Sequence, residues 1–191
     1  MSPRDEILAR LGRNLPACPP LPEIPLFDSS SFDLKETFRR NLARMGGEFV
    51  ELPVGEVQSW MRGKFPQAAV ICSAAPEVAG NRALESIRDP RELEDVDVGV
   101  VRARFGVAET GSVWLSETEF KVNALGFLSQ HLVVLLDLRK LVPNLHHAYR
   151  DPGFLEARYA VLMTGPSATA DIEGVLVRGA QGIRSLTVVG C

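Results

Sequence analysis

Short apolar runs alternate with amphipathic segments along most of this chain. Residues 31–45 place Leu34, Phe38, Leu42 and Met45 on one helical face, and residues 55–63 can form a second helix. The predicted strands are residues 48–52, 68–72, 98–101, 132–136 and 186–189, and of these 68–72 and 132–136 have the composition of buried strands. Strands that alternate with helices favour parallel pairing. The pattern therefore predicts an α/β fold with a mostly parallel sheet covered by helices.

Two further stretches depart from this simple alternation. In residues 106–117, Val113 and Leu115 alternate with polar or amphipathic neighbours, which predicts strands flanking a small-residue turn at Glu109-Thr110-Gly111-Ser112. A helical piece is expected around residues 143–149, after the strand at 132–136.

The stretch from Tyr159 to Gly182 is the one around which we expect the chemistry to be organised. An apolar run, residues 159–164, stops at Gly165-Pro166 and is followed by small hydroxyl residues and two carboxylates. After it come Ile172, Val175, Leu176 and Gly179 at spacings of three, four and seven. That spacing predicts a helix that ends at Gly182, so the order is strand, polar loop, helix. Such junctions often border ligand sites in α/β proteins.

The first thirty residues differ from the rest. Ser2 and Pro3 begin a predicted short helix that ends near Gly12, and residues 16–25 hold five of the thirteen prolines. Proline favours extended geometry, which indicates an arm or a linker. We therefore divide the chain into an N-terminal helix with a proline-rich arm, residues 1–30, and a single α/β domain, residues 31–191.

Composition and charge narrow the class of protein. A chain of 191 residues, 46% of them apolar, can bury one sizeable core. The net charge of −3 argues against nucleic acid as a partner, because that affinity depends largely on Lys and Arg. The first residues are charged, and no apolar run approaches the roughly 20 residues that span a bilayer. We expect a cytoplasmic protein without a membrane span.

Metal and redox chemistry have little support in the sequence. Cys18, Cys72 and Cys191 are far apart with no C-x-x-C pair, so no iron–sulfur or zinc site is encoded and no cofactor is expected in this chain. His146 and His147 are adjacent and would point in different directions on a helix, so no metal site is predicted there. His131, directly before a buried strand, suits a packing or capping role as well as a base.

The polar loop has two interpretations, which the sequence alone leaves open. Its candidate ligand-binding residues are Gly165, Pro166, Ser167, Thr169, Asp171 and Glu173. In the first interpretation Ser167 or Thr169 caps the helix and the two carboxylates lie in its first turn, where the helix dipole favours them. In the second, the same groups line a pocket for a polar ligand. Two carboxylates disfavour a phosphate at this helix end.

The turn at residues 109–112 is the second candidate site. Glu109, Thr110, Gly111 and Ser112 offer a carboxylate and two hydroxyls, and Glu109 is the one candidate for a catalytic acid, base or nucleophile. A solvated hairpin turn is the alternative. Arg102 and Arg104, just upstream, are candidates for a clamp on a small carboxylate ligand.

These same residues resemble those of a known family. Ala108-Glu109-Thr110-Gly111-Ser112 and Gly165-Pro166-Ser167-Ala168-Thr169-Ala170-Asp171-Ile172-Glu173-Gly174, with Gly179 and Gly182, are similar to motifs of the LUD-domain proteins of the LutC/YkgG type. The resemblance runs from about Phe32 to the C-terminus, and the short N-terminal helix also matches. It implies the NagB/RpiA/CoA-transferase-like α/β fold. Two positions depart from the pattern, since the family usually has Asp in place of Glu109 and commonly Pro in place of Ile183.

The resemblance also implies a role. The family is associated with growth on L-lactate, as one of three proteins that oxidise lactate to pyruvate, and the other members carry the cysteine clusters. This chain would then be the non-cluster subunit, with iron–sulfur-containing lactate utilization subunits as partners. The resemblance assigns no catalytic residue, so activity of the chain alone stays open.

Two alternatives belong to other classes. One is a stand-alone CoA-transferase-like enzyme, since CoA transferases of this fold group use a glutamate next to Asn-Gly as nucleophile. Glu109-Thr110-Gly111 lacks that Asn, so the role is not carried over. The other is a metabolite-binding regulatory or assembly module.

Overall fold

Five parallel strands form the central sheet of the protein, in a computed structural model that describes residues 2–13, 19–20, 22–27, 33–170 and 175–191. The strand order is β1-β11-β6-β3-β2. The bounds are β1 Glu48–Glu51, β2 Ile71–Ser73, β3 Val98–Arg102, β6 His131–Leu136 and β11 Ser185–Gly190. The mostly parallel α/β sheet predicted from the sequence is confirmed, although β2 begins three residues later than the apolar run suggested.

Both faces of this sheet are covered, which explains why its inner strands β3 and β6 are almost entirely apolar. In β6, Val133 and Leu135 belong to the core on one face, whereas Leu132, Val134 and Leu136 belong to the core on the other. Successive residues of a strand point to opposite faces, so a strand covered on both sides must be apolar throughout. The central strand of the sheet is therefore an uninterrupted hydrophobic segment.

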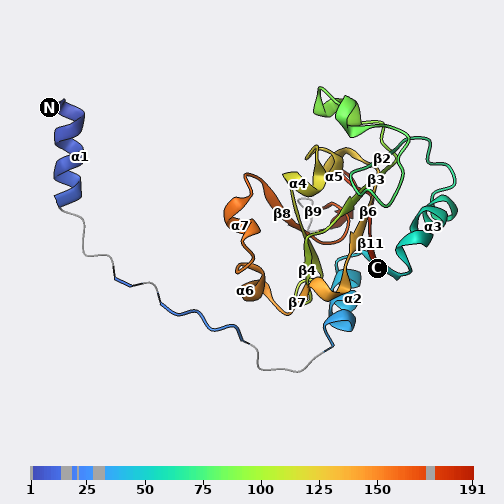
Figure 1. The fold of residues 1–191 in the computed structure, drawn as a ribbon, viewed down its shortest axis with the longest axis horizontal. Coiled ribbons are helices and arrows are strands. Elements are labelled where there is room, and N and C mark those ends of the chain that lie inside the picture. Colours follow the sequence, from blue (N-terminus) through green and yellow to red (C-terminus); the bar gives the residue numbers. More distant parts are fainter. Residues whose placement is uncertain (1, 14–18, 21, 28–32, 171–174) are drawn as a thin grey trace.

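Different elements cover the two faces. Helix α3 (Val57–Lys64) packs Val57 and Met61 onto one face, together with Val98, Val133 and Val189. Helix α2 (Leu34–Arg44) packs Phe38 and Leu42 onto the other, together with strands of a second sheet. Figure 1 shows α3 on one side of the central strands, with β4, β8, α6 and α7 on the opposite side.

The second sheet has four strands in the order β7-β4-β5-β8. Its bounds are β4 Phe105–Val107, β5 Ser112–Ser116, β7 Leu141–Val142 and β8 Ala160–Met163. The antiparallel β4–β5 pair confirms the predicted hairpin around the turn at 109–112. The run at 159–164 forms β8 as expected, but β8 pairs antiparallel with β5 and lies outside the parallel sheet.

The remaining helices are α1 Pro3–Arg13 and four short ones. The short helices are α4 Glu117–Phe120, α5 Leu125–Leu128, α6 Leu145–Ala148 and α7 Gly153–Glu156. Single 3₁₀ turns cover Val54–Glu56, Leu84–Ser86, Pro90–Leu93 and Leu138–Lys140. The helical piece predicted at 143–149 corresponds to α6, which Asn144 caps by accepting a hydrogen bond from the His147 N–H at 3.1 Å.

The prediction of a helix after Gly165 is wrong for the residues that the structure describes. Strands β9 (Ala168–Ala170) and β10 (Leu176–Arg178) form an antiparallel hairpin there, and residues 171–174 lie outside the described residues. The helical spacing arose from an apolar run, Val175-Leu176-Val177, whose side chains are all exposed, so no helical face is buried. Gly179 and Gly182 both have positive φ and make turns at the base of the hairpin.

The N-terminal helix and the end of the arm are built differently. No residue of α1 is buried, and Figure 1 shows this helix apart from the α/β body. Farther along the arm, the Asn144 side-chain amide donates a hydrogen bond to the Leu26 carbonyl at 2.8 Å, and the Phe27 ring lies against His146. The arm is therefore attached to the body at residues 26–27.

Candidate functional site

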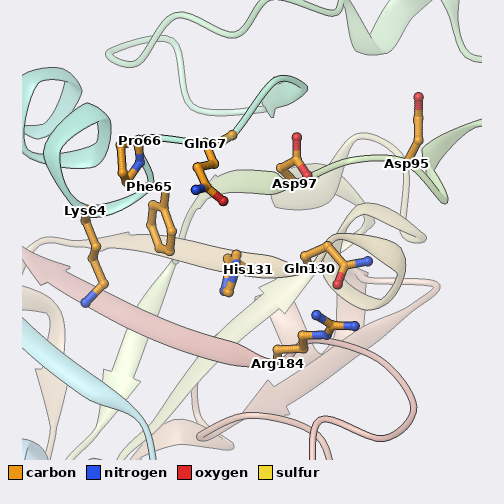
Figure 2. Close-up of a pocket in the computed structure, with 10 residues that line it drawn as sticks. Lys64, Phe65, Pro66, Gln67, Asp95, Asp97, Gln130, His131 and Arg184 are labelled. Atoms are coloured by element: carbon orange, nitrogen blue, oxygen red, sulfur yellow. The ribbon is translucent and has the colours of Figure 1, made fainter.

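A polar pocket opens at the amino ends of the central strands β3, β6 and β11 (Figure 2). Its volume is about 620 Å³. The lining residues come from four separate segments and are Lys64, Phe65, Pro66, Gln67, Ala68, Asp95, Asp97, Gln130, His131 and Arg184. Backbone hydrogen bonds join three of these segments, because the His131 N–H donates to the Asp97 carbonyl at 2.9 Å and the Arg184 N–H donates to the Gln130 carbonyl at 2.7 Å.

His131 is the first residue of β6 and is held from two sides. Its Nδ1 lies 2.8 Å from the Ser185 Oγ, and its ring stacks on Phe65 with centroids 4.7 Å apart. Burial lowers the pKa of the His131 imidazole below its usual value of 6.5, and the positive charge of Arg184 lowers it further, while Asp97 opposes the shift. The imidazole is therefore neutral at pH 7 and keeps one nitrogen lone pair that can accept a proton or a hydrogen bond.

The charged groups around His131 differ in whether they already have hydrogen-bond or ion-pair partners. Asp97 accepts the backbone N–H groups of Ala69 and Val70 at 2.7 and 2.8 Å. Two more side chains have ion-pair partners outside the pocket, Lys64 with Glu48 and Asp95 with Arg82.

Arg184 is different from these. Its guanidinium forms no ion pair with any residue that the structure describes. Figure 2 shows the Arg184 guanidinium and the Gln130 amide on the same side of His131. A neutral base, an amide and an available cation are therefore adjacent, and they can hold a small anion that also has a hydroxyl or keto group.

The opposite end of the sheet has a cavity whose charges are already balanced. It has a volume of about 560 Å³, and Asp137, Arg139 and Cys191 are among its lining residues. The Arg139 guanidinium lies 2.9 Å from Asp137 and holds the pKa of that carboxyl at about 2. Because ligand-binding charges are available at the amino ends and neutralised at the carboxyl ends, we take the His131 pocket as the candidate site.

The pH dependence of stability provides a test of the His131 environment. Because the folded pKa of His131 is lowered, the unfolded chain binds more protons below about pH 6.5, and stability that is present above this pH is lost as the pH falls through the folded pKa. We expect the free energy of unfolding, measured in urea from about pH 8 to about pH 5, to decrease toward acid. The decrease should be smaller in His131→Asn, and an unchanged slope would contradict the assignment.

The turn at residues 109–112 joins three elements of the fold. The Glu109 carboxylate accepts the Leu145 N–H of α6 at 3.1 Å. The Asn41 side chain on α2 donates to the carbonyls of Ala108 and Glu109, each at 2.9 Å. Gly111 has a φ of +66°, and a Cβ there would overlap the backbone of α2. These contacts connect the β4–β5 hairpin to α2 and α6.

Two hydroxyls accompany Glu109 in this turn. Ser112 is the first residue of β5 and is buried, and the Thr110 Oγ1 is buried without a hydrogen-bond partner among the described residues. The turn therefore directs its hydroxyls into the protein.

The Asn41 contacts predict a measurable stability effect. Asn41→Ala removes both side-chain donors and leaves two carbonyls with fewer partners, so we expect a loss of about 1 to 3 kcal/mol in the free energy of unfolding. The neighbouring exposed Arg40→Ala variant should change stability by less than about 0.5 kcal/mol. Chemical denaturation of both variants tests this, and equal effects would mean that the bridge to the turn carries no stability.

The loop after β8 also contacts α2. Gly165 has a φ of +65°, and a Cβ there would overlap the carbonyl group of Met45 at the end of α2. Beyond Pro166, Ser167 closes the base of the hairpin, because its Oγ donates to the Gln181 carbonyl and its N–H donates to the Ile183 carbonyl. Ser167 therefore holds a β-hairpin here, whereas the helix-capping interpretation required a helix.

The other candidates of this loop are placed as follows. Pro166 and Ser167 line a small cavity of about 300 Å³ together with Gly165. Thr169 lies in β9 and is exposed. Asp171 and Glu173 lie outside the described residues.

The structure brings the two motifs to the same helix. Gly111 and Gly165 both press on the C-terminal part of α2, whereas the cavity lined by Gly165, Pro166 and Ser167 has no lining residue from the turn at 109–112. The two candidate clamp residues are also separate. Arg102 forms an ion pair with Glu77 at 2.7 Å, and Arg104 forms one with Asp151 at 2.9 Å.

Most of the His131 pocket was not identified from the sequence. The sequence indicates a packing or capping role or a base for His131, and it gives no reason to single out Lys64, Gln130 or Arg184. The available signal is positional, since His131 and Ser185 begin two buried apolar runs that pair in parallel. Within the described residues, no group of three or more His, Cys, Asp or Glu is placed to hold a metal ion, and no helix is long and apolar enough to cross a membrane.

Comparison with known proteins gives a family match and several relatives. Residues 81–189 match the family model described as the LUD domain. The chain is 24% identical over 205 residues to a lactate utilization protein C of Geobacillus sp. (strain WCH70), which covers 97% of this chain and 78% of that protein. It is 27% identical over 130 residues to the uncharacterized protein NMB1437 of Neisseria meningitidis serogroup B, and this alignment covers 66% of the chain but only 55% of that relative.

A solved structure shares the fold. The crystal structure of a DUF162 family protein from Deinococcus radiodurans superposes with a TM-score of 0.65 at 15% sequence identity. The match covers 82% of this chain and 95% of that one. At this identity the likeness concerns the fold alone, and it agrees with the α/β architecture described above.

Proposed function

The chain belongs to the LUD-domain family, and from this membership we propose that it is a non-cluster subunit of a multi-protein system that oxidises L-lactate to pyruvate. The observation that carries the proposal is the similarity to lactate utilization protein C along 97% of this chain. The motifs around Glu109 and Gly165 support the same assignment, because they resemble those of the LutC/YkgG type.

The proposed assignment of roles to the subunits follows from the redox balance of the reaction. Converting lactate to pyruvate removes two electrons and two protons, so an electron acceptor is needed. The three cysteines of this chain are far apart in sequence and form no cluster motif, and of the two that the structure describes Cys72 is buried within the core. We therefore assign the electron-accepting iron–sulfur clusters to partner subunits and the binding of a small carboxylate to this chain.

The His131 pocket suits such a ligand. The available Arg184 guanidinium can pair with the carboxylate, and the neutral His131 can exchange a hydrogen bond with the group on the adjacent carbon. A small hydroxy acid or keto acid satisfies both groups at once. The ligand roles predicted for Glu109–Ser112 and for the loop after Gly165 stay predictions.

Reconstitution tests the proposed role. The chain is combined with the candidate cluster-bearing subunits, and lactate-dependent reduction of an electron-acceptor dye is followed. We expect activity to require this chain, and equal activity without it would overturn the proposal.

Variants then test the pocket separately. Arg184→Gln should raise the KM for lactate about tenfold or more with a smaller change in kcat, because a carboxylate anchor binds substrate and transition state alike. Arg44→Gln, an exposed change on α2, should leave both constants unchanged. Normal kinetics in Arg184→Gln would exclude the pocket but leave the subunit role standing.

The exposed N-terminal helix favours a role in subunit assembly, in addition to the proposed role in lactate oxidation. Ile7, Leu8 and Leu11 of α1 are 54% to 60% exposed, although they form one apolar face. We propose that this face contacts a partner subunit. Ile7→Glu with Leu11→Glu should weaken co-purification with the cluster-bearing subunits, and unchanged assembly would exclude this contact.

A further inference from the structure

Another pocket, beside the second sheet, has an excess of positive charge. It lies beside β4, β7, α6 and α7 and has a volume of about 730 Å³. The lining residues are Arg104, Phe105, Lys140, Val142, His147, Ala148, Arg150, Asp151 and Pro152. Among these residues are three cations, Arg104, Lys140 and Arg150, and one carboxylate, Asp151, so the lining has an excess of two positive charges. The chain as a whole has a net charge of −3, so this concentration of cations is a local feature.

The one carboxylate of the pocket is already engaged. The Asp151 Oδ1 lies 2.9 Å from the Arg104 Nε and accepts the Gly153 N–H at 2.8 Å. Lys140 and Arg150 have no ion pair with any described residue. Both are exposed at the rim, where they can turn toward a ligand. The charge of Asp137 acts on Lys140 as well, but Asp137 forms its ion pair with Arg139, so the positive charge of the pocket is only partly offset by the described residues.

Arg104 is held in place in a way that leaves its binding groups available. Its Nε is fixed by Asp151, and its Cζ lies 5.6 Å from the centroid of the Trp114 ring. On another side the Gly153 backbone is so close that a Cβ there would lie 3.0 Å from the Arg104 Cζ. The two terminal nitrogens make no hydrogen bond with a described residue. A guanidinium fixed at Nε with both terminal nitrogens available is a preorganised fork for two oxygens of one anion.

We propose that this pocket binds a dianionic oxyanion, either a phosphate monoester or a dicarboxylate. Two ligand oxygens pair with the terminal nitrogens of Arg104, and Lys140 and Arg150 balance the remaining charge. Phe105, Val142 and Pro152 provide apolar surface for the carbon part of the ligand. A volume of this size is typical of small-molecule pockets. The proposal does not depend on the lactate role, because it concerns a different pocket and a ligand of different charge.

Trp114 provides a direct optical probe of binding. The chain has two tryptophans, so Trp60→Phe leaves Trp114, adjacent to Arg104, as the only one. In this background, phenyl phosphate, inorganic phosphate, succinate and L-lactate are titrated at low ionic strength, with calorimetry in parallel. We expect saturable binding of a dianion, with a dissociation constant at least about tenfold lower than that of L-lactate. L-lactate is a monoanion and makes one charge-assisted contact fewer than a dianion does. Affinity should decrease as salt is added.

Variants then test which residues carry the binding. Lys140→Gln combined with Arg150→Gln should weaken dianion binding about tenfold or more, and these exposed changes should leave the fold intact. Arg104→Lys retains the charge but removes the fork, so it should weaken binding as well. Arg62→Gln, an exposed change on α3, is the matched control and should have no effect.

The outcomes separate the ligand sources and can overturn the proposal. Binding of phenyl phosphate but not succinate identifies a phosphate site, and the reverse identifies a dicarboxylate site. Equal binding of L-lactate and the dianions would overturn the proposal, as would no saturable binding. It would also be overturned if the Lys140 and Arg150 double variant and the Arg62 control behaved alike, whatever the folding of Arg104→Lys.

Discussion

Gly111→Ala is expected to destabilise the protein by about 2 to 5 kcal/mol. Two independent effects add at this position. The φ of +66° lies in the left-handed region, which costs an L-residue with a side chain about 1 to 2 kcal/mol. In addition, the new methyl group would overlap the backbone of α2 at Leu42 and lie 2.7 Å from the Asn41 carbonyl carbon. These backbone atoms belong to the C-terminal part of α2 and cannot move aside without displacing the helix.

The control for this prediction is a glycine where an added Cβ would meet no neighbouring atom. Gly63 lies inside α3, and a Cβ there would meet nothing within 4 Å. Gly63→Ala should therefore stabilise the protein by about 0.4 to 1 kcal/mol, because alanine reduces the conformational freedom of the unfolded chain. Urea denaturation of both variants measures the difference. A Gly111→Ala protein as stable as the wild type would show that the turn does not press on α2.

The glycines of the two family motifs thus have a common physical explanation. Gly111 and Gly165 both have positive φ, and both bring their backbones against the C-terminal part of α2. Only glycine allows this approach without strain. The motifs therefore bring together the helix, the β4–β5 hairpin and the loop after β8, and their glycines are required for the fold whether or not the neighbouring polar groups bind a ligand.

The central sheet could be predicted from the sequence because its inner strands are buried on both faces. The inner strands β3 and β6 are short apolar runs between polar or helical segments, and that signal is local. The edge strand β1 has a glutamate at each end and only partly buried residues between them. The second sheet could be predicted only in part. The β4–β5 hairpin is local, whereas the pairing of β8 with β5 joins residues more than 40 positions apart, such as Val113 and Met163. Periodicity within a segment carries no information about such a partner.

The helix predicted after Gly165 shows where pattern matching fails. Val175 and Leu176 satisfy the helical spacing, but with Val177 they also make a continuous apolar run, which suits a strand equally well. The turn geometry at Gly179 and the anchoring of Ser167 on Gln181 and Ile183 are tertiary contacts that favour the hairpin. Short segments are decided by such contacts rather than by their own pattern.

The candidate site was harder to predict than the fold. Lys64, Asp97, His131 and Arg184 come from four segments, and none belongs to a contiguous motif. They meet because their strands lie side by side in the order β11-β6-β3, which the sequence does not reveal. His131 is distinguished in the sequence only by its position directly before a buried strand. Its lowered pKa depends on burial and on Arg184, and both are properties of the folded chain.

Leu42→Ala is expected to cost about 2 to 5 kcal/mol of the free energy of unfolding. Leu42 is fully buried in the core that α2 forms with the central sheet, and its side chain packs directly on Gly47. Its backbone is also the surface that Gly111 contacts, so a shift of α2 into the cavity would strain the turn as well. Relaxation around the cavity is thereby limited, which places the cost toward the upper part of this range.

The same substitution on α7 provides the control for Leu42→Ala. Leu155 is 94% exposed, so Leu155→Ala removes the same atoms without leaving a cavity and should change stability by less than about 0.5 kcal/mol. Denaturant unfolding of both variants gives the comparison. A second test is whether Leu42→Ala and Gly111→Ala combine additively, because residues in direct contact are expected to deviate from additivity by about 0.5 kcal/mol or more. Strict additivity would mean that the turn and α2 respond independently, and that the turn is not held by its contact with this helix.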